Sequence, residues 1–329
     1  PVDWDWSKSW AENQQAGALP TQDLLLAGRL TIIMLFPLSL VFLYQSARQM
    51  HTPLTGLLAV AFLGVNALAL LHTRRAMAEG VLTMSVCLAL WSFLLGDRKP
   101  WLAGFGAALA FCAKQSALAL LPVGLLAVMW LPAKGSRQVS KAVRNAGAFL
   151  LCFFLACLAL NPLWWSNPAA ALSASWAARQ ELLSRQSGQT PTSVWEVLPQ
   201  RTAISIPNLT IAPLAFYEVG NYRQQTAAAE KAYQANPLHS LLRGPVGGGA
   251  WFILALAGIF VGARRFFYRQ KEGGMRRAAG ARRTLAIGLT ATLAQWAALV
   301  VWVPLSWQRY VLPVVPFLCL WCAYGIGVQ

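Results

Sequence analysis

The chain has 329 residues, of which 57% are apolar and only 12% are charged, and its net charge at pH 7 is +16. Long apolar runs are too numerous for a soluble domain of this length, so we predict an all-α, polytopic integral membrane protein. The positive excess lies in short segments between the apolar runs. This placement indicates contact with a membrane surface and argues against a nucleic acid as the partner.

Nine apolar runs are predicted to span the membrane as helices. They cover residues 24–44, 53–71, 79–95, 101–113, 116–131, 146–160, 247–262, 285–303 and 310–326. The stretch 101–131 is divided at Lys114-Gln115, because one helix of about 45 Å would exceed the hydrocarbon core of a bilayer. The division also keeps the most basic loops on one side of the membrane.

The loops between the predicted spans alternate between strongly basic and mixed. Residues 263–283 hold eight Arg or Lys and one Glu, and only two of the eleven acidic residues fall in basic loops. Basic loops face the cytoplasm in most membrane proteins. We therefore expect a single membrane domain, residues 1–329, in four parts. These are a non-cytoplasmic segment 1–23, six transmembrane helices in 24–160, a large non-cytoplasmic loop 161–246, and three transmembrane helices in 247–329.

The large loop is predicted to carry short amphipathic helices. Asn167 followed by Pro168 is a favourable helix start, and apolar side chains then recur at helical spacing, as in a helix that lies on the membrane surface. A second helix is predicted over residues 222–234. The apolar stretch 204–216 is punctuated by proline and is predicted to be a loop that dips into the membrane interface.

The turn after the second predicted span contains the sharpest chemical signal. Arg74 and Arg75 break the charge bias of the non-cytoplasmic side, which indicates an anionic partner. His72, Arg75 and Glu79 fall on one face of a helix. The alternative is an Arg75–Glu79 ion pair with both arginines reaching toward lipid headgroups. Ionisable groups at membrane depth are functional more often than not, which favours a site.

Three further residues on the same predicted side could hold a phosphate. Lys114 lies in the tight turn between two short spans, Arg309 lies at the mouth of the last span, and the Tyr217 hydroxyl can donate a hydrogen bond. The alternatives are a lysine that reaches the interface and aromatic-belt anchoring for Arg309 and Tyr217.

The N-terminal segment contains carboxylates beside indoles, and indoles also follow the sixth predicted span. Both segments are predicted to lie at the membrane interface. Asp3, Asp5 and Trp165 are candidate contacts to a sugar or a hydroxyl acceptor, with interfacial anchoring as the alternative. The six cysteines all lie in apolar runs, so no disulfide is predicted, and Cys319 and Cys322 are expected to pack rather than bind metal. The sequence contains no phosphate loop, dinucleotide fingerprint or zinc-ligand spacing.

Four segments in this order resemble the polyprenyl-phosphate-dependent glycosyltransferases of GT-C type. They are HTRRAMAE at 72–79, AKQSALALLP at 113–122, NPLWW at 161–165 and WQRYVLP at 307–313. The chain is similar in this respect to the protein O-mannosyltransferases of family 39 and to the aminoarabinose transferases. The resemblance covers most of the chain and implies a GT-C-like fold in the cell membrane, with the active site on the non-cytoplasmic face.

The resemblance implies inverting transfer of a sugar from a polyprenyl-phosphate donor to a hydroxyl of a protein, lipid or glycan acceptor. The residues on the predicted non-cytoplasmic face are compatible with this reaction: Arg74, Arg75, Lys114 and Arg309 would hold the donor phosphate, with Tyr217 as a candidate hydrogen-bond donor. Glu79 is the candidate catalytic residue, which would position acceptor or sugar hydroxyls, and His72, Asp3, Asp5 and Trp165 are candidate acceptor or sugar contacts. The sequence identifies no cofactor with certainty, and a divalent metal is left open.

One feature of the family is not matched. Its acidic motif follows a first span, whereas here no span precedes Asp3 and Asp5. The catalytic base is therefore expected upstream of Pro1, with Asp3 or Asp5 as the alternative. Two other functions stay open, a transporter or lipid flippase for an anionic substrate and a non-catalytic scaffold. Ionisable residues at span ends rather than mid-span favour an enzyme.

Overall fold

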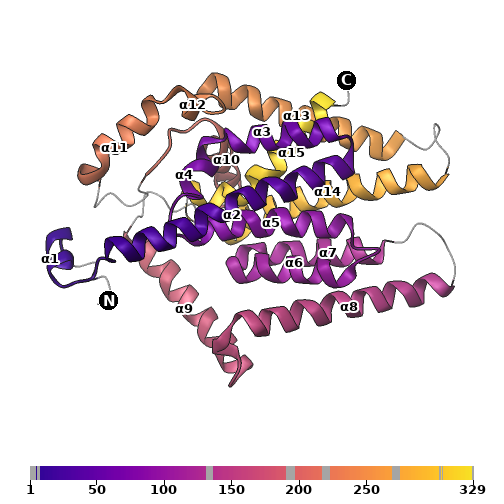
Figure 1. Cartoon of the computed structure of the whole chain (residues 1–329), viewed down its shortest axis with the longest axis horizontal. Helices are drawn as coiled ribbons and strands as arrows, with labels where there is room; N and C mark the ends of the chain where they lie inside the picture. The colour runs from indigo at the N-terminus through magenta and orange to yellow at the C-terminus, as the bar shows by residue number, and fades with distance from the viewer. Residues whose placement is uncertain are drawn as a thin grey trace.

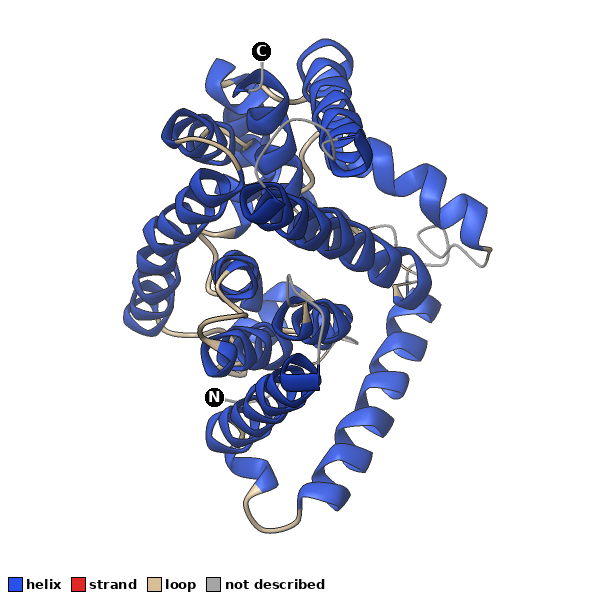
Figure 2. Ribbon diagram, turned by 90° about the vertical axis from the view of Figure 1, so that its right-hand side faces the viewer, coloured by secondary structure: helices blue, strands red, loops and turns tan. Residues whose placement is uncertain are grey.

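The computed structural model describes residues 5, 8–130, 136–189, 197–216, 223–268, 275–303, 305 and 307–327. Helices joined by loops make up nearly all of this part of the chain (Figure 2). The first half contributes α1 Trp10–Gln15, α2 Gln22–Met50, α3 Pro53–Gly64, α4 Ala67–His72, α5 Ala78–Leu94, α6 Pro100–Ala113, the 3-10 helix η1 Gln115–Ala119, α7 Leu120–Met129 and α8 Ser136–Leu160.

The second half begins with short helices and ends with three long ones. The first set is the 3-10 helix η2 Pro162–Trp164, α9 Pro168–Gln189, α10 Leu198–Thr210, α11 Arg223–Ala235 and α12 Pro237–Ser240. The second set is α13 Gly244–Tyr268, α14 Met275–Trp302, the 3-10 helix η5 Gln308–Val314 and α15 Val315–Gly327. In Figure 1, α8 runs along one side of the bundle, α13 runs along the opposite side, and α9 leaves the end of α8 at a steep angle.

Within the described residues, five helices are long and apolar enough to cross a membrane. They are Gln22–Met50, Gln138–Leu160, Gly244–Phe267, Ala279–Trp302 and Gln308–Gly327. Large apolar side chains point outward along α2, with Met34 69% and Leu24 58% exposed. Such a stripe is unfavourable in water and favourable against lipid. The fold is therefore the all-helical, multi-pass membrane fold that the composition predicts.

The predicted count of nine spans stays a prediction, because four further apolar helices are shorter. They are Pro53–Gly64, Ala78–Leu94, Pro100–Ala113 and Gln115–Met129. The predicted span 53–71 is broken between α3 and α4, where the Asn66 side chain accepts a hydrogen bond from the Ala69 amide at 3.1 Å. The predicted turn at Lys114-Gln115 is present, because α6 ends at Ala113 and η1 begins at Gln115.

Segment 161–246 carries the two helices predicted for it. α9 begins at Pro168, and the Asn167 side chain caps it by accepting from the Ala170 amide at 3.0 Å. The prediction of an interfacial loop over 204–216 is wrong in its first half, because α10 continues to Thr210. The guanidinium of Arg243, more than 30 residues later, donates to the carbonyls of Asn208, Leu209 and Ala212 and so satisfies the end of this helix. No local pattern reveals a cap supplied from so far along the chain.

The basic segments gather at one end of the bundle. The starts of α8 and α14 lie at the same end in Figure 1. There Arg283 of α14 donates to the carbonyls of Leu94 (2.8 Å) and Ala127 (2.9 Å) and forms an ion pair with Asp97 at 3.1 Å. A guanidinium is suited to this position because the carbonyls at a helix C-terminus are unsatisfied and carry partial negative charge. Arg283 thus joins the ends of α5 and α7 to the start of α14.

The opposite end is organised around η5. The Gln308 side chain accepts from the Ala215 amide at 2.9 Å and donates to the carbonyl of Pro213, which fixes the segment after α10. Arg201 of α10 donates to the carbonyl of Val301 at 2.9 Å. The end of α14, η5 and α10 are therefore held together where segment 161–246 folds back on the bundle.

Candidate functional site

A buried ion pair lies at the η5 end of the bundle. The ammonium of Lys114 is 3.1 Å from Oε1 of Glu79, and the Glu79 side chain is only 5% exposed. Glu79 is in the first turn of α5, where the helix dipole favours a carboxylate. Lys114 has extended backbone (φ −161°, ψ 131°) between α6 and η1. The helix break thus carries the lysine at the junction of two short helices.

Aromatic rings lie beside Lys114 and beside a second cation, Arg309. The Lys114 ammonium is 4.4 Å from the ring centre of Tyr310, and the guanidinium carbon of Arg309 is 4.6 Å from the ring centre of Trp307. The Trp307 and Tyr310 rings are stacked with centres 5.7 Å apart. Cations within about 6 Å of an aromatic ring are attracted by its quadrupole. Trp307, which precedes η5, and Tyr310 within it therefore contact two cations whose charges act on the Glu79 carboxylate.

His72 is buried next to these charges. It is 1% exposed, and neither ring nitrogen has a hydrogen-bond partner among the described residues. Burial, and after it the charge of Arg75, lower the pKa of His72 to about 3; Glu79 acts in the opposite direction, and Arg309 and Lys114 lower the pKa by smaller amounts. The imidazole is therefore neutral at physiological pH. The charged groups that act on the imidazole are three cations and the Glu79 carboxylate, so their net charge is +2.

The two adjacent arginines diverge. Arg75 donates to the carbonyl of Phe216 at 2.8 Å, and its guanidinium carbon lies 5.4 Å from the centre of the Phe216 ring. Arg74 is exposed, donates to the carbonyl of Leu70, and lies over the ring of Tyr233 in α11 at 5.1 Å. Arg75 thus contacts the segment that Gln308 anchors, while Arg74 faces α11. The ion pairs of the described residues do not include the alternative Arg75–Glu79 pair; Glu79 pairs with Lys114 instead.

A cavity of about 220 Å³ opens beside Lys114. Its walls come from η1, α9, the end of α14 and η5, and the residues are Lys114, Gln115, Ser116, Arg179, Leu182, Leu183, Trp302, Val303 and Tyr310. Arg179 donates to Oε1 of Gln115 at 2.9 Å. The cavity therefore has two cationic side chains and a largely apolar wall, which suits an anionic headgroup attached to a hydrocarbon chain.

Arg179 and Gln115 were not among the predicted site residues. Arg179 carries a signal in the sequence, because it is an arginine at helical spacing on the face of α9 that includes Leu183. That position is partly buried in the structure, whereas Leu172 and Trp176 are more than half exposed. The sequence could not reveal that α9 brings this face to η1, 64 residues away.

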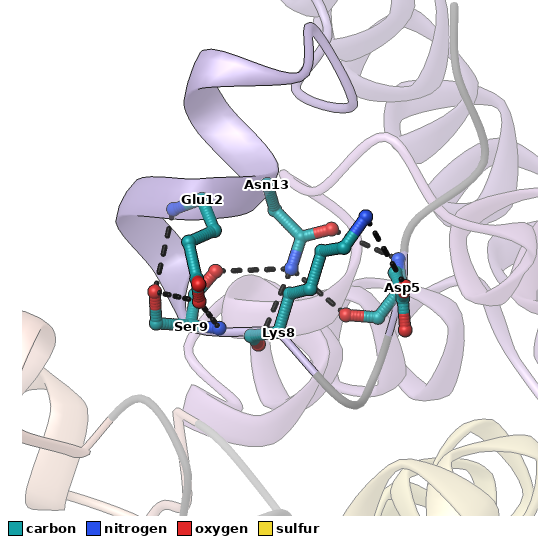
Figure 3. A network of polar contacts seen from close by, with 5 residues as sticks. All are labelled: Asp5, Lys8, Ser9, Glu12 and Asn13. Atoms are coloured by element: carbon teal, nitrogen blue, oxygen red, sulfur yellow. Dashed lines mark hydrogen bonds and ion pairs between the residues drawn. The ribbon is translucent and has the colours of Figure 1, made fainter.

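Asp5 and Trp165 are not part of this cluster of contacts. Asp5 lies next to α1, where its carboxylate forms a 3.4 Å ion pair with Lys8 and its backbone exchanges hydrogen bonds with Asn13 (Figure 3). The Ser9–Glu12 capping box completes this local network. Trp165 is 65% exposed and donates to the carbonyl of Leu158 at 2.8 Å. The predicted positions Asp3 and Tyr217 lie outside the described residues.

The described residues contain no group of three or more His, Cys, Asp or Glu placed to hold a metal ion. The structure brings together His72, Arg75, Glu79, Lys114 and Arg309, with the rings of Trp307 and Tyr310 beside them. The excess positive charge and the adjoining cavity make this end of the bundle chemically suited to bind a phosphate.

Comparisons with known proteins gave one structural similarity. No protein-family model matches the chain, and no curated protein matches it. Among solved structures, the chain is similar to the archaeal oligosaccharyltransferase AglB from Archaeoglobus fulgidus, in complex with an inhibitory peptide and a dolichol-phosphate. The TM-score is 0.44 and the sequence identity is 12%, over 96% of this chain and 41% of that chain. The chain thus spans less than half of the length of that protein.

Proposed function

We propose that this protein is a GT-C-type glycosyltransferase that moves a sugar, with inversion, from a polyprenyl-phosphate donor to an acceptor hydroxyl. The observation that carries the proposal is the Glu79–Lys114 pair, set among additional cations and open to a cavity of about 220 Å³. The four sequence segments that resemble such enzymes support it, since three of them supply Glu79, Lys114 and Arg309. The acceptor class, whether protein, lipid or glycan, is left open.

The donor phosphate would be held by cations at the mouth of the cavity. When the sugar leaves, negative charge develops on the lipid phosphate, and preorganised positive groups lower the barrier by stabilising that charge. Lys114 is the central group in this proposal because it both lines the cavity and belongs to the buried cluster. Arg309 and Arg75 add positive charge beside it. Arg74, which faces α11, and Tyr217, which lies outside the described residues, belong to the proposed phosphate set on the sequence resemblance alone.

Glu79 is proposed to position Lys114. Its carboxylate accepts a hydrogen bond from the ammonium, and a carboxylate held in this way is a weak base. Proton abstraction from the acceptor is therefore assigned to another carboxylate, as the resemblance already implies. In the transfer reaction Glu79 would keep the ammonium directed at the phosphate through the whole cycle.

The proposed orientation places the site on the non-cytoplasmic face of the cell membrane, together with segment 161–246. Arg265 of α13 and Arg283 of α14 lie at the other end of the bundle, which would face the cytoplasm by the positive-inside rule. A transporter for an anionic substrate would place its charges near the middle of its spans. Here Glu79 and Lys114 lie at the ends of α5 and α6, which favours surface chemistry.

The test follows hydrolysis of the donor, in which water takes the sugar in place of the acceptor hydroxyl. The protein, purified in lipid nanodiscs, is supplied with a polyprenyl-phosphate sugar, and release of polyprenyl phosphate is followed by mass spectrometry. We expect Lys114→Ala to lower the rate by about 10²- to 10³-fold, the effect of removing one preorganised group that stabilises developing charge. Lys141→Ala, which removes an exposed cation of α8, should leave the rate unchanged. Equal rates for both variants would contradict the proposal.

A further inference from the structure

We propose that Cys112 and Cys157 form a disulfide that ties the end of α6 to the end of α8. The two Sγ atoms are 3.9 Å apart, although 45 positions separate the residues in the sequence. Both are free thiols in the structure. The sequence alone offered no pairing, because the two cysteines lie in different apolar runs.

The cysteines lie at one end of a continuous contact between two parallel helices. A Cβ added at Gly104 of α6 would collide with the carbonyl oxygen of Phe149 in α8, so the two backbones touch there. Cys112 and Cys157 are each eight residues farther along, or about 12 Å. The helices therefore stay in register between the two contacts, and the thiols face each other because the same two helix faces meet.

Small residues make the close approach possible. Gly104, Ala108 and Cys112 recur every fourth residue on α6, and Ala108 is fully buried. Such a pattern lets helices in a membrane pack backbone to backbone. A disulfide has an S–S distance of about 2.0 Å. The sulfurs need to approach by about 2 Å, a movement that rotation of one side chain about χ1 supplies.

The surroundings of Cys112 favour exchange chemistry. Asn161 donates a hydrogen bond to Sγ of Cys112 at 3.2 Å and another to the carbonyl of Cys157 at 2.7 Å. A donor directed at sulfur stabilises the thiolate, which is the reactive form. Cys112 is also only partly buried. Cys319 and Cys322 are fully buried, and the Cys322 thiol is directed at the carbonyl of Trp251.

The oxidation is a thiol–disulfide exchange with a protein disulfide or with oxidised glutathione. The Cys112 thiolate attacks the oxidant disulfide, which forms a mixed disulfide and releases one oxidant thiolate. Cys157, after losing its proton, attacks Sγ of Cys112 and releases the second oxidant thiol. The pair loses two electrons and two protons, and the oxidant gains them. Disulfides persist outside the cytoplasm, so this inference rests on the proposed orientation of the site.

The bond would act next to the proposed phosphate site. Cys112 is two residues before Lys114, and Cys157 is four residues before Asn161, where segment 161–246 begins. A covalent link at this point would fix the helix break that carries Lys114 relative to the start of that segment. The disulfide would therefore restrict movement of one wall of the cavity.

The experiment reads thiol state directly. Cells that make the protein are quenched in acid to stop thiol–disulfide exchange, and free thiols are then blocked with N-ethylmaleimide in denaturant at neutral pH, where the reactive thiolate is available. The purified chain is digested without reduction and examined by mass spectrometry. We expect the linked Cys112–Cys157 peptide in most molecules of the wild type and of Cys152→Ser, a matched change on α8. Cys112→Ser should lack it. Wild type in which both cysteines carry maleimide would overturn the proposal.

This readout is independent of sugar transfer. A Cys112–Cys157 disulfide in a protein that releases no polyprenyl phosphate would contradict the proposed function and support the disulfide. Maleimide on both cysteines of a protein that releases polyprenyl phosphate would overturn the disulfide and support the proposed function.

Discussion

The ammonium of Lys114 lies 3.1 Å from a carboxylate oxygen of Glu79, across 35 positions of sequence. The pair joins the first turn of α5 to the break between α6 and η1, and the Glu79 side chain is almost fully buried. A buried charge is tolerated only when it is paired. The two residues should therefore depend on each other for stability as well as for the proposed function.

Replacing Lys114 alone should destabilise the fold more than replacing Lys114 and Glu79 together. Lys114→Met leaves the Glu79 carboxylate buried without its cation, which we expect to lower the free energy of unfolding by about 3 kcal/mol. Adding Glu79→Gln should recover most of that loss, since the remaining amide carries no charge. Thermal unfolding of the wild type, both single variants and the double variant in nanodiscs measures the coupling. Additive effects of the two changes would show that the pair is not formed.

Arg179 is expected to contribute to binding of the lipid-linked donor. Its guanidinium lines the cavity and contacts Gln115, next to Lys114. We predict that Arg179→Ala raises the KM for a polyprenyl-phosphate sugar about tenfold, the effect of one charged hydrogen bond. Arg185→Ala is the matched control, because Arg185 lies on the same helix and pairs only locally with Glu181 in the contacts described. An equal KM for both variants would exclude Arg179 from the donor site.

His72 should make the protein less stable in mild acid. Its pKa is lowered to about 3 in the folded state, first by burial and then by Arg75, against an ordinary value of about 6.5. Between these values the unfolded chain binds a proton that the folded chain does not, so stability falls as pH falls, by up to about 1.4 kcal/mol per pH unit. His72→Leu should remove this dependence. The measurement is the melting temperature of the wild type and of His72→Leu between pH 4 and pH 7. Parallel curves would show that His72 does not cause the loss of stability in acid.

Two glycines provide a matched test of the α6–α8 contact. Gly104→Ala places a methyl group against the Phe149 carbonyl, whereas Gly147→Ala on α8 meets no atom within 4 Å. We expect the first change to destabilise the protein by about 1–3 kcal/mol, as overpacking does. The second should be neutral or slightly stabilising, because alanine favours a helix over glycine. Equal melting temperatures would show that the two helices pack less closely than described.

The membrane class and most helices could be predicted from apolar runs and caps alone. The turn at Lys114-Gln115 followed from charge alternation, and the start of α9 followed from Asn167-Pro168. The rest depends on contacts between distant segments. α10 extends to Thr210 because Arg243 caps it, and Asn66 interrupts a run that reads as continuously apolar.

The residues of the candidate site could be predicted from local sequence patterns, but the contacts between them could not. The sequence brought His72, Arg75 and Glu79 to attention through helical spacing, and it marked Lys114 and Arg309 through their position at the ends of apolar runs. It could not show that Glu79 pairs with Lys114 rather than Arg75, since that choice depends on how α5 packs against α6. Arg179 was missed for a similar reason, because only the tertiary fold brings α9 to η1.

The central claim is that the Lys114 cluster binds the phosphate of a polyprenyl-linked donor. The most direct measurement is equilibrium binding of a polyprenyl phosphate and of the matching uncharged polyprenol to the protein in nanodiscs. The protein should bind the phosphate about 10- to 100-fold more tightly, as one charged hydrogen bond provides. The folded double variant Glu79→Gln/Lys114→Met should lose that preference, while Lys141→Met should keep it. Equal affinity of the wild type for phosphate and alcohol would contradict the account.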